Sequence, residues 1–368
     1  MSAPSADPVR EQRLLKAAQA GDEPAFASLL EPYRRELHAH CYRMLGSVYD
    51  ADDALQDASL RAWRALGRFE GRSSLRSWLY TIATNTCLTQ IQRRPKRVLP
   101  VDYGPSTDPL TGPGEPIVES VWIEPYPDTE LEDGLAGPEA RYEQRESVEL
   151  AFIAALQHLP ASQRAVLILR EVLGFSAKEV AESLETTVAS VNSALQRARA
   201  SIEERAPERS QQETLRALGD DELEEIVRVY VDAWERNDVE AVVAMLTEDA
   251  AIAMPPLASW FGPRAVMAQF LAAFPMSGAW RWKGLATSAN GQAAFGAYVW
   301  DEATDVYLPF ALNVLTLRGD KVSDVVAFAV RAIDASERER YHRWVDEPLD
   351  EQRTAGTFAR FGLPDQLR

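Results

Sequence analysis

The sequence predicts a multidomain protein in which two all-α domains precede an α+β domain. Its 368 residues are long for one domain and suit two or three. Apolar residues recur at helical spacing in residues 10–97 and again in residues 138–206. From residue 221 onward, two helical segments give way to alternating apolar and polar runs. Helices followed by a strand meander indicate an α+β domain.

A segment rich in proline, glycine and acidic residues separates the two helical blocks. The first block ends at Arg93-Arg94-Pro95-Lys96-Arg97, where Pro95 stops the helix. Residues 98–137 contain nine acidic residues and no basic residue, and no period of 2 or 3.6 is sustained in them. We therefore expect a linker over residues 98–137.

The α+β domain is predicted over residues 215–333. We expect helices over residues 221–236 and 239–246, before the strands begin. Asn290-Gly291 is a strong two-residue hairpin signal, and Arg318-Gly319-Asp320-Lys321 marks a second hairpin turn. Residues 334–368 show little periodicity and are predicted to be a tail, which either docks on the helical domains or frays.

Charge and composition exclude several classes of protein. The net charge of −17 argues against nucleic-acid binding when taken whole, but residues 10–97 hold 15 basic and 10 acidic residues, so a basic part is local. No apolar run approaches the length of a membrane helix, which predicts a cytoplasmic protein without a membrane partner. Cys41 and Cys87 lack metal-ligand spacing, so neither a disulfide, a metal nor a cofactor is expected.

The second block carries the pattern of a helix-turn-helix. Ser176 and Glu179 form an S-x-x-E capping box that starts a short helix. In the next helix, apolar residues recur at Val188, Val191, Leu195, Ala198 and Ile202. Its other face carries short hydrogen-bonding side chains and two arginines, as a helix in the major groove needs. The solvated face of a bundle helix remains an equal alternative.

The first block contains two helices with unusual polar faces. One helix, over residues 49–66, gathers a charged face at Asp52, Asp53, Gln56, Asp57 and Arg61, which composition alone assigns to solvent. A later helix places arginine, tyrosine and amide side chains together over residues 73–94, a combination that suits single-stranded DNA. The alternative is that Trp78 and Tyr80 are core aromatics.

Both blocks resemble the sigma-70 family of bacterial transcription initiation factors. The segment Leu159-Pro160, Gln163-Arg164, Gly174-Phe175-Ser176, Glu179-Val180-Ala181 and Arg197-Ala198-Arg199 resembles sigma region 4, which reads the −35 promoter element. The run from Asp50 to Asp57 with Arg61-Ala62-Trp63 resembles the region 2 helix that docks on the clamp of the polymerase beta-prime subunit. Residues 73–94 resemble the part of region 2 that melts and reads the −10 element. Two regions joined by an acidic linker define the extracytoplasmic-function (ECF) group.

The resemblance implies partners and site residues. It implies core RNA polymerase (beta-prime clamp and beta flap) and promoter DNA as partners, and a linker that threads toward the RNA exit channel. The core-polymerase-binding residues implied are Asp53, Gln56, Asp57 and Arg61. The implied −10 residues are Arg76, Tyr80, Asn85, Arg93 and Arg94, with Lys96 and Arg97 adding phosphate attraction. The −35 residues are Thr187, Ser190, Asn192, Ser193, Gln196 and Arg197.

The third domain resembles the SnoaL-like cone fold. The resemblance starts at the run from Val229 to Val239 and implies a pocket lined by Trp234, Met254, Trp260, Tyr298 and Asn313. Catalytic members of that fold need an acid/base pair, and all four histidines lie outside the cone, so no enzyme activity is expected. We expect the cone to modulate a sigma factor in cis. The alternatives are a cone-fold enzyme or ligand sensor with a DNA-binding arm, and an ordinary helix-turn-helix repressor.

Overall fold

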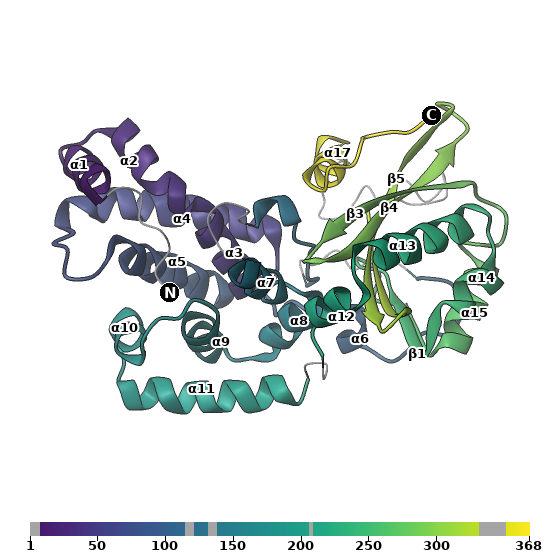
Figure 1. Ribbon diagram of the computed structural model, residues 1–368, viewed down its shortest axis with the longest axis horizontal. Helices are drawn as coiled ribbons and strands as arrows, with labels where there is room; N and C mark the ends of the chain where they lie inside the picture. The colour runs from purple at the N-terminus through teal and green to yellow at the C-terminus, as the bar shows by residue number, and fades with distance from the viewer. Residues whose placement is uncertain (1–7, 115–120, 132–137, 206–208, 331–350) are drawn as a thin grey trace. The chain divides into compact units, whose positions relative to one another are not determined.

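The computed structural model describes residues 8–114, 121–131, 138–205, 209–330 and 351–368 (Figure 1). The chain divides into two compact units, which are described one at a time. The first combines Met1–Arg97 with Glu130–Pro207, and the second combines Val98–Thr129 with Glu208–Arg368. The sequence predicted the helical blocks and the α+β part, but it did not predict that the intervening segment belongs to the second unit.

The first block folds as five helices, three of which begin at a side-chain cap. Their bounds are α1 (Pro8–Gln19), α2 (Glu23–Leu30), α3 (Arg34–Leu45), α4 (Val48–Ala65) and α5 (Leu75–Ile91). Ser47 accepts a hydrogen bond from the Asp50 amide at the start of α4, and Ser74 caps α5 in the same way. Gly46 ends α3 with a φ of 71°. Helices α3, α4 and α5 pack together around fully buried Cys41, Tyr42, Met44 and Ala51.

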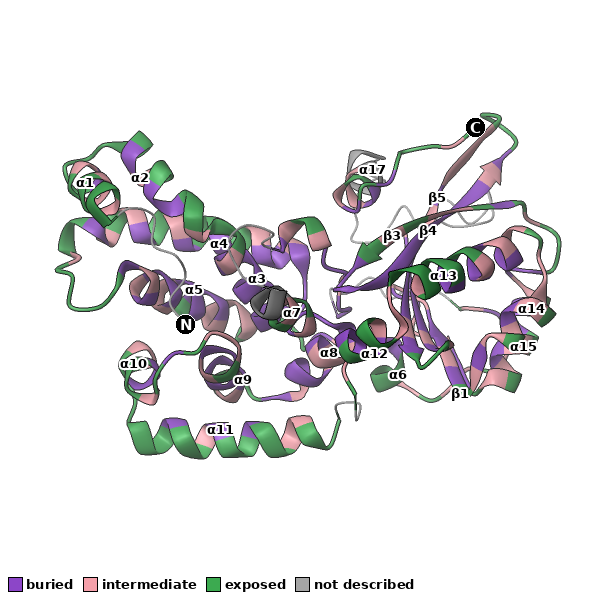
Figure 2. Cartoon of the chain, viewed as in Figure 1, coloured by how far each residue is buried: buried purple, intermediate pink, exposed green. Residues whose placement is uncertain are grey.

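The second block is a helix-turn-helix, as predicted. Its helices are α7 (Pro138–Glu146), α8 (Leu150–His158), α9 (Ala161–Leu167), α10 (Ala177–Ser183) and α11 (Val188–Glu203). The predicted capping box is confirmed, because the Glu179 amide donates to Ser176 Oγ and the Ser176 amide to Glu179 Oε2. A π-helical turn, Ile168–Val172, continues α9 toward Phe175. Val191, Leu195 and Ala198 bury one face of α11, while most of its length is exposed (Figure 2).

The second unit is built on one six-stranded sheet. Its strands are β1 (Leu246–Ala253), β2 (Trp260–Phe261), β3 (Trp282–Ala289), β4 (Gln292–Asp301), β5 (Val306–Arg318) and β6 (Lys321–Ala329). The order is β2-β1-β6-β5-β4-β3, with β1 and β6 parallel and the other pairs antiparallel. Both predicted hairpin turns are present, and Asn290 and Gly291 have φ values of 57° and 67°.

Helices cover one face of this sheet. They are α12 (Gln211–Leu218), α13 (Asp220–Glu235), α14 (Val239–Ala244) and α15 (Arg264–Ala273). Phe295 of β4 and Leu315 of β5 lie in the same apolar cluster as Tyr230 of α13 and Phe270 of α15. Helix α12 starts before the predicted boundary at residue 215, and Gln211 fixes it to β5 by exchanging two 2.8 Å hydrogen bonds with the Leu317 backbone.

Much of the predicted linker is bound to the sheet. Helix α6 (Pro100–Tyr103) begins it, and the Thr107 amide donates to the Trp260 carbonyl oxygen at the β2 edge. At the other end of the sheet, the Tyr126 backbone exchanges two 2.8 Å bonds with Asn290, and Asp128 Oδ1 accepts from the Gly291 amide. The residues 115–120 and 132–137 of the predicted linker lie outside the described residues.

The end of the predicted tail also packs on the sheet. Helix α17 (Glu351–Arg360) and the residues after it lie on the side of β4 away from α13 (Figure 1). Phe358 is fully buried, and Tyr307 and Leu367 exchange two backbone hydrogen bonds. We predicted that the tail either docks on the helical domains or frays. For residues 356–368 both alternatives are replaced by packing on the sheet of the second unit. Residues 334–350 lie outside the described residues.

Candidate nucleic-acid interface

The charged residues of α4 share one exposed face. Asp53, Gln56, Asp57 and Arg61 are all exposed, whereas Ala51, Leu55, Ala58 and Ala62 on the opposite face are buried. Leu60 lies beside them with 47% of its surface exposed. Within the described ranges, none of the four polar side chains forms a hydrogen bond or an ion pair. An exposed leucine among unpaired charges is typical of a surface that binds another protein.

The predicted −10 residues are divided between solvent and the protein interior. Asn85 and Arg93 are exposed. Arg94 and Arg97 both form ion pairs with Asp50, and Arg97 is buried, so the basic cluster after α5 is partly neutralised. Lys96 lies 2.7 Å from His158 Nδ1. Of the cations expected to attract phosphate, Arg93 alone among these four is both exposed and without a partner in the described structure.

Arg76 and Tyr80 lie in a closed cluster on α5. Arg76 forms a two-pronged ion pair with Glu36, with Nε 3.1 Å and Nη2 3.0 Å from Oε2. The Arg76 guanidinium lies 4.9 Å from the Tyr80 ring centre and 5.1 Å from that of Phe175. Tyr80 is 1% exposed, and burial together with the nearby Glu36 carboxylate raises the pKa of its hydroxyl. In this conformation Tyr80 cannot stack on a base.

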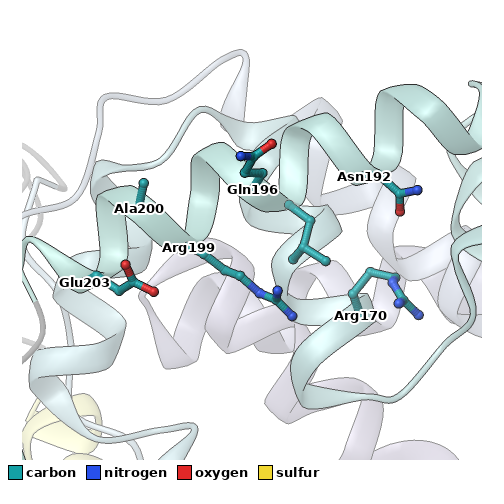
Figure 3. A pocket seen from close by; sticks show the side chains of 7 residues that line it. Arg170, Asn192, Gln196, Arg199, Ala200 and Glu203 are labelled. Atoms are coloured by element: carbon teal, nitrogen blue, oxygen red, sulfur yellow. The ribbon is translucent and has the colours of Figure 1, made fainter.

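The predicted −35 residues are all exposed on or beside α11. Thr187 uses its hydroxyl to cap the helix, accepting from the Ser190 amide at 3.1 Å. Asn192 and Gln196 line a shallow groove between α11 and the turn after α9, together with Arg170, Leu195, Arg199, Ala200 and Glu203 (Figure 3). Ser193 and Arg197 lie opposite the buried face of the helix at 3.6 residues per turn. The structure therefore splits the predicted set between an outward face and a groove.

The predicted cone residues are not all brought together. Trp234 and Met254 pack with the apolar cluster between helices and sheet, and Asn313 pairs in register with Phe295 of that cluster. Trp260 instead donates its indole hydrogen to the Gly104 carbonyl oxygen, 2.8 Å away in the predicted linker. Tyr298 faces the other side of the sheet. The prediction that Trp260 and Tyr298 line one pocket with the other three residues is therefore wrong.

Strand alternation explains the position of Tyr298. Since Phe295 and Ala297 face the helices, the next residue along β4 points to the opposite face. There the Tyr298 hydroxyl donates to the Pro364 carbonyl oxygen at 2.9 Å, and Phe358 packs edge-on at 5.2 Å. Tyr230 was not among the predicted cone residues, although its hydroxyl is buried beside the Trp234 indole of the same helix. Its spacing of four residues from Trp234 on one helix was the available signal.

The histidines and other potential metal ligands are dispersed in the described part of the chain. His38, His40 and His158 lie in the first unit, and His342 lies outside the described residues. The described residues contain no group of three or more histidine, cysteine or acidic side chains that could hold a metal ion. Among them there is also no helix with the length and apolar character to cross a membrane.

Comparisons with known proteins match all three parts of the chain. Residues 29–97 match Sigma-70 region 2, residues 149–202 match Sigma-70 region 4, and residues 227–325 match the SnoaL-like domain. The chain is similar to an ECF RNA polymerase sigma factor, SigG, of Mycobacterium tuberculosis, with 41% identity over 99% of this chain and 94% of the relative. It is 31% identical to the RNA polymerase sigma-H factor of Pseudomonas aeruginosa, over 53% of this chain and 92% of that one.

A solved structure supports the fold over most of the chain. The crystal structure of the extracytoplasmic function sigma factor SigJ of Mycobacterium tuberculosis aligns with a TM-score of 0.51 and 20% identity, over 82% of this chain and 96% of that chain. That likeness concerns the fold alone. The near-complete match to a curated relative at 41% identity settles the family. The chain belongs to the ECF RNA polymerase sigma factors, and it carries a C-terminal SnoaL-like domain.

Proposed function

We propose that this sigma factor engages core polymerase through the exposed face of α4. Asp53, Gln56, Asp57 and Arg61 supply the polar contacts to the beta-prime clamp, and Leu60 supplies an apolar contact between them. The observation that carries this proposal is the exposed and unpaired state of that face, next to an α4 face that is fully buried in the helical core. Opposite charges on a partner offset the cost of desolvating such surface charges.

Promoter recognition is assigned to α5 and α11. Asn85 and Arg93 are exposed and free to contact the −10 element in the present conformation, whereas Arg76, Tyr80 and Arg94 must exchange their internal partners for DNA. On α11, Ser190, Ser193, Gln196 and Arg197 are placed to read the −35 element, and Asn192 lies at the edge of that surface. The beta flap is the polymerase element that we expect to hold region 4.

The SnoaL-like domain is proposed to modulate the sigma regions in cis and to catalyse no reaction. Support comes from its binding of the segment that joins regions 2 and 4, at Gly104 to Pro113 and at Tyr126 to Asp128. A small ligand in the cone interior is the second candidate. The observation that favours it is that the buried Tyr230 hydroxyl and Trp234 indole nitrogen, which interact with each other, have no further hydrogen-bond partner among the described residues. A ligand would raise the melting temperature of the second unit in a thermal-shift screen.

Run-off transcription with purified core polymerase tests the assignment. The full chain should direct initiation on a library of promoter fragments, and R61A and D57A should reduce binding to core polymerase by about tenfold or more. R35A is the matched control, because Arg35 is equally exposed on α3 but lies outside the proposed surfaces. If R61A, D57A and R35A all bind core polymerase like the unmodified chain, the α4 assignment is wrong.

A further inference from the structure

The −10 side of region 2 is covered by a residue of region 4. Phe175 lies just before the capping box of α10, and its ring is 5.3 Å from that of Tyr80. It also contacts the Arg76 guanidinium, which Glu36 holds from the other side. Both Phe175 and Tyr80 are buried, at 7% and 1% exposure. We name this cluster of Phe175, Arg76, Tyr80 and Glu36 the Phe175 seal.

Two hydrogen bonds of its backbone join Phe175 to region 4. Its amide donates to the Leu169 carbonyl oxygen at 2.9 Å, and its own carbonyl oxygen accepts from Arg170. Gly174 reaches it with a φ of 70°, a conformation that residues other than glycine rarely adopt. These bonds hold the Phe175 backbone to region 4. Movement of region 4 away from region 2 would therefore carry the ring off Tyr80 and open the seal.

Part of the contact between the two regions is polar. Arg43 of α3 donates to Ser147 Oγ at 2.7 Å and to the Ser147 carbonyl oxygen at 3.2 Å. Arg164 of α9 donates to the Met44 carbonyl oxygen at the end of α3. Gln157 Nε2 donates to the Arg43 carbonyl oxygen at 3.3 Å. Groups of this kind regain hydrogen bonds to water on separation, so a polar contact opens at lower cost than an apolar one of the same area.

The promoter is too long for the closed arrangement. The −10 and −35 elements are about 25 base pairs apart, which is about 85 Å of duplex at roughly 3.4 Å per base pair. A compact body of roughly 175 residues, such as the first unit, is only about 40 Å across. Regions 2 and 4 therefore cannot occupy both elements while Phe175 covers Tyr80.

We infer that the Phe175 seal is an internal lock on the −10 surface, in which region 4 occupies the place of single-stranded DNA. The Phe175 ring stacks where a base would stack, and the Glu36 carboxylate holds Arg76 as a phosphate would. This inference rests on the proposed −10 role of Arg76 and Tyr80. The lock makes the free chain a weak DNA binder until separation of the regions exposes both side chains.

The test measures binding of a fluorescein-labelled, single-stranded DNA 20-mer of random sequence to the full chain by anisotropy. F175A and E36Q remove one part of the lock each, and both should tighten binding by about threefold to tenfold, since they raise the open fraction. F175L, which keeps an apolar side chain without a ring, should show the same direction and protects the test against misfolding of F175A. F26A is the matched control, because Phe26 packs on Trp63 within region 2 and outside the seal.

The outcomes separate the lock from the DNA-binding role. If R76A weakens binding while F175A, F175L and E36Q leave it within twofold of the unmodified chain, the lock is refuted and the −10 role of Arg76 stands. If F175A and F175L tighten binding but R76A has no effect, the lock is supported and the proposed −10 role of Arg76 is wrong. Equal tightening by F26A would show a general loosening of the fold and would also refute the lock.

Discussion

Arg164 is a buried cation whose partners are all neutral. Its guanidinium donates to the Met44 carbonyl oxygen, to Gln157 Oε1 at 2.5 Å, to the Gln157 carbonyl oxygen at 3.0 Å and to that of Leu159 at 3.3 Å. Burial lowers the pKa of this arginine to about 10. The carbonyl oxygens lie at the ends of α3 and α8, where the helix dipole is negative and favours a cation.

Shortening this side chain is predicted to destabilise the first unit. R164K keeps the charge but cannot reach the four acceptors with one ammonium group, so buried carbonyl oxygens lose their donors. We expect the free energy of unfolding to fall by about 2–4 kcal/mol, measured by urea denaturation. R35K, at an exposed position of α3, should change it by less than about 0.5 kcal/mol. A loss below 1 kcal/mol for R164K would contradict the assigned role.

His40 predicts an acid-sensitive first unit. The ring is fully buried with Nε2 2.9 Å from Thr84 Oγ1, and burial, with Arg43 and Arg76 nearby, lowers its pKa from 6.5 to about 3. Below pH 6.5 the unfolded chain binds a proton that the folded chain does not bind until about pH 3. The contribution of neutral His40 to the free energy of unfolding is therefore fully present above pH 6.5. As the pH is lowered from 6.5 toward 3, this contribution falls by about 1.4 kcal/mol per pH unit.

The pH dependence can be assigned to His40 by substitution. H40Q cannot take up that proton, so its unfolding free energy should fall less steeply between pH 6.5 and 5 than that of the unmodified chain. Urea denaturation across this range, followed by circular dichroism, gives both slopes. H158Q, which removes a half-buried histidine, is the matched control and should keep the original slope. Parallel curves for H40Q and the unmodified chain would exclude the histidine as the source.

Single residues of the site were predicted as well as helical periodicity allows. The period gave the exposed face of α4 and the outward face of α11 correctly, because one buried stripe defines the opposite surface. It could not show that Tyr80 is covered, because the covering residue, Phe175, is 95 positions away and belongs to another domain. Nor could it show the pairing of Arg94 and Arg97 with Asp50, since a basic cluster and an acid at a helix start carry no mutual signal.

At the scale of elements, local signals were sufficient wherever a turn or cap is encoded by adjacent residues. The capping box of α10 and the Asn290-Gly291 turn are examples. The segment around Tyr126 and the one around Phe358 gave no such signal, because each binds the sheet through isolated aromatic residues rather than through a repeating pattern. Sheets accept such segments wherever backbone groups at an edge or hairpin are unpaired.

Docking of α17 makes one element-scale prediction. A methyl group at Gly296 would lie 2.6 Å from Leu363 and 3.0 Å from Phe358, both of which are buried. G296A should therefore displace the C-terminal segment, and limited trypsin digestion should cleave at Arg360 sooner than in the unmodified chain. G356A, where an added methyl meets nothing within 4 Å, is the matched control. Unchanged cleavage in G296A would mean that the segment adapts in place.

At the scale of the whole molecule, the division into two units does not follow the order of the chain. The segment that connects regions 2 and 4 is part of the unit that contains the SnoaL-like domain. Two parts of this segment form hydrogen bonds to the sheet, one at the β2 edge and one at the β3–β4 hairpin. The SnoaL-like domain is therefore bonded directly to the segment that connects regions 2 and 4, and this contact is the physical route for the proposed control in cis.

This arrangement predicts that removal of the SnoaL-like domain alone yields a defective protein. A chain ended at residue 206 keeps Trp122, Ile123 and Tyr126, which are at most 6% exposed in the full chain, but loses Asn290, which binds Tyr126. Newly exposed aromatic residues promote association, so the truncated chain should elute from size-exclusion chromatography as larger species. Replacing these three residues by serine in the truncated chain should restore a monomer. A monomeric truncated chain with all three intact would show that the connection needs no cover from the SnoaL-like domain.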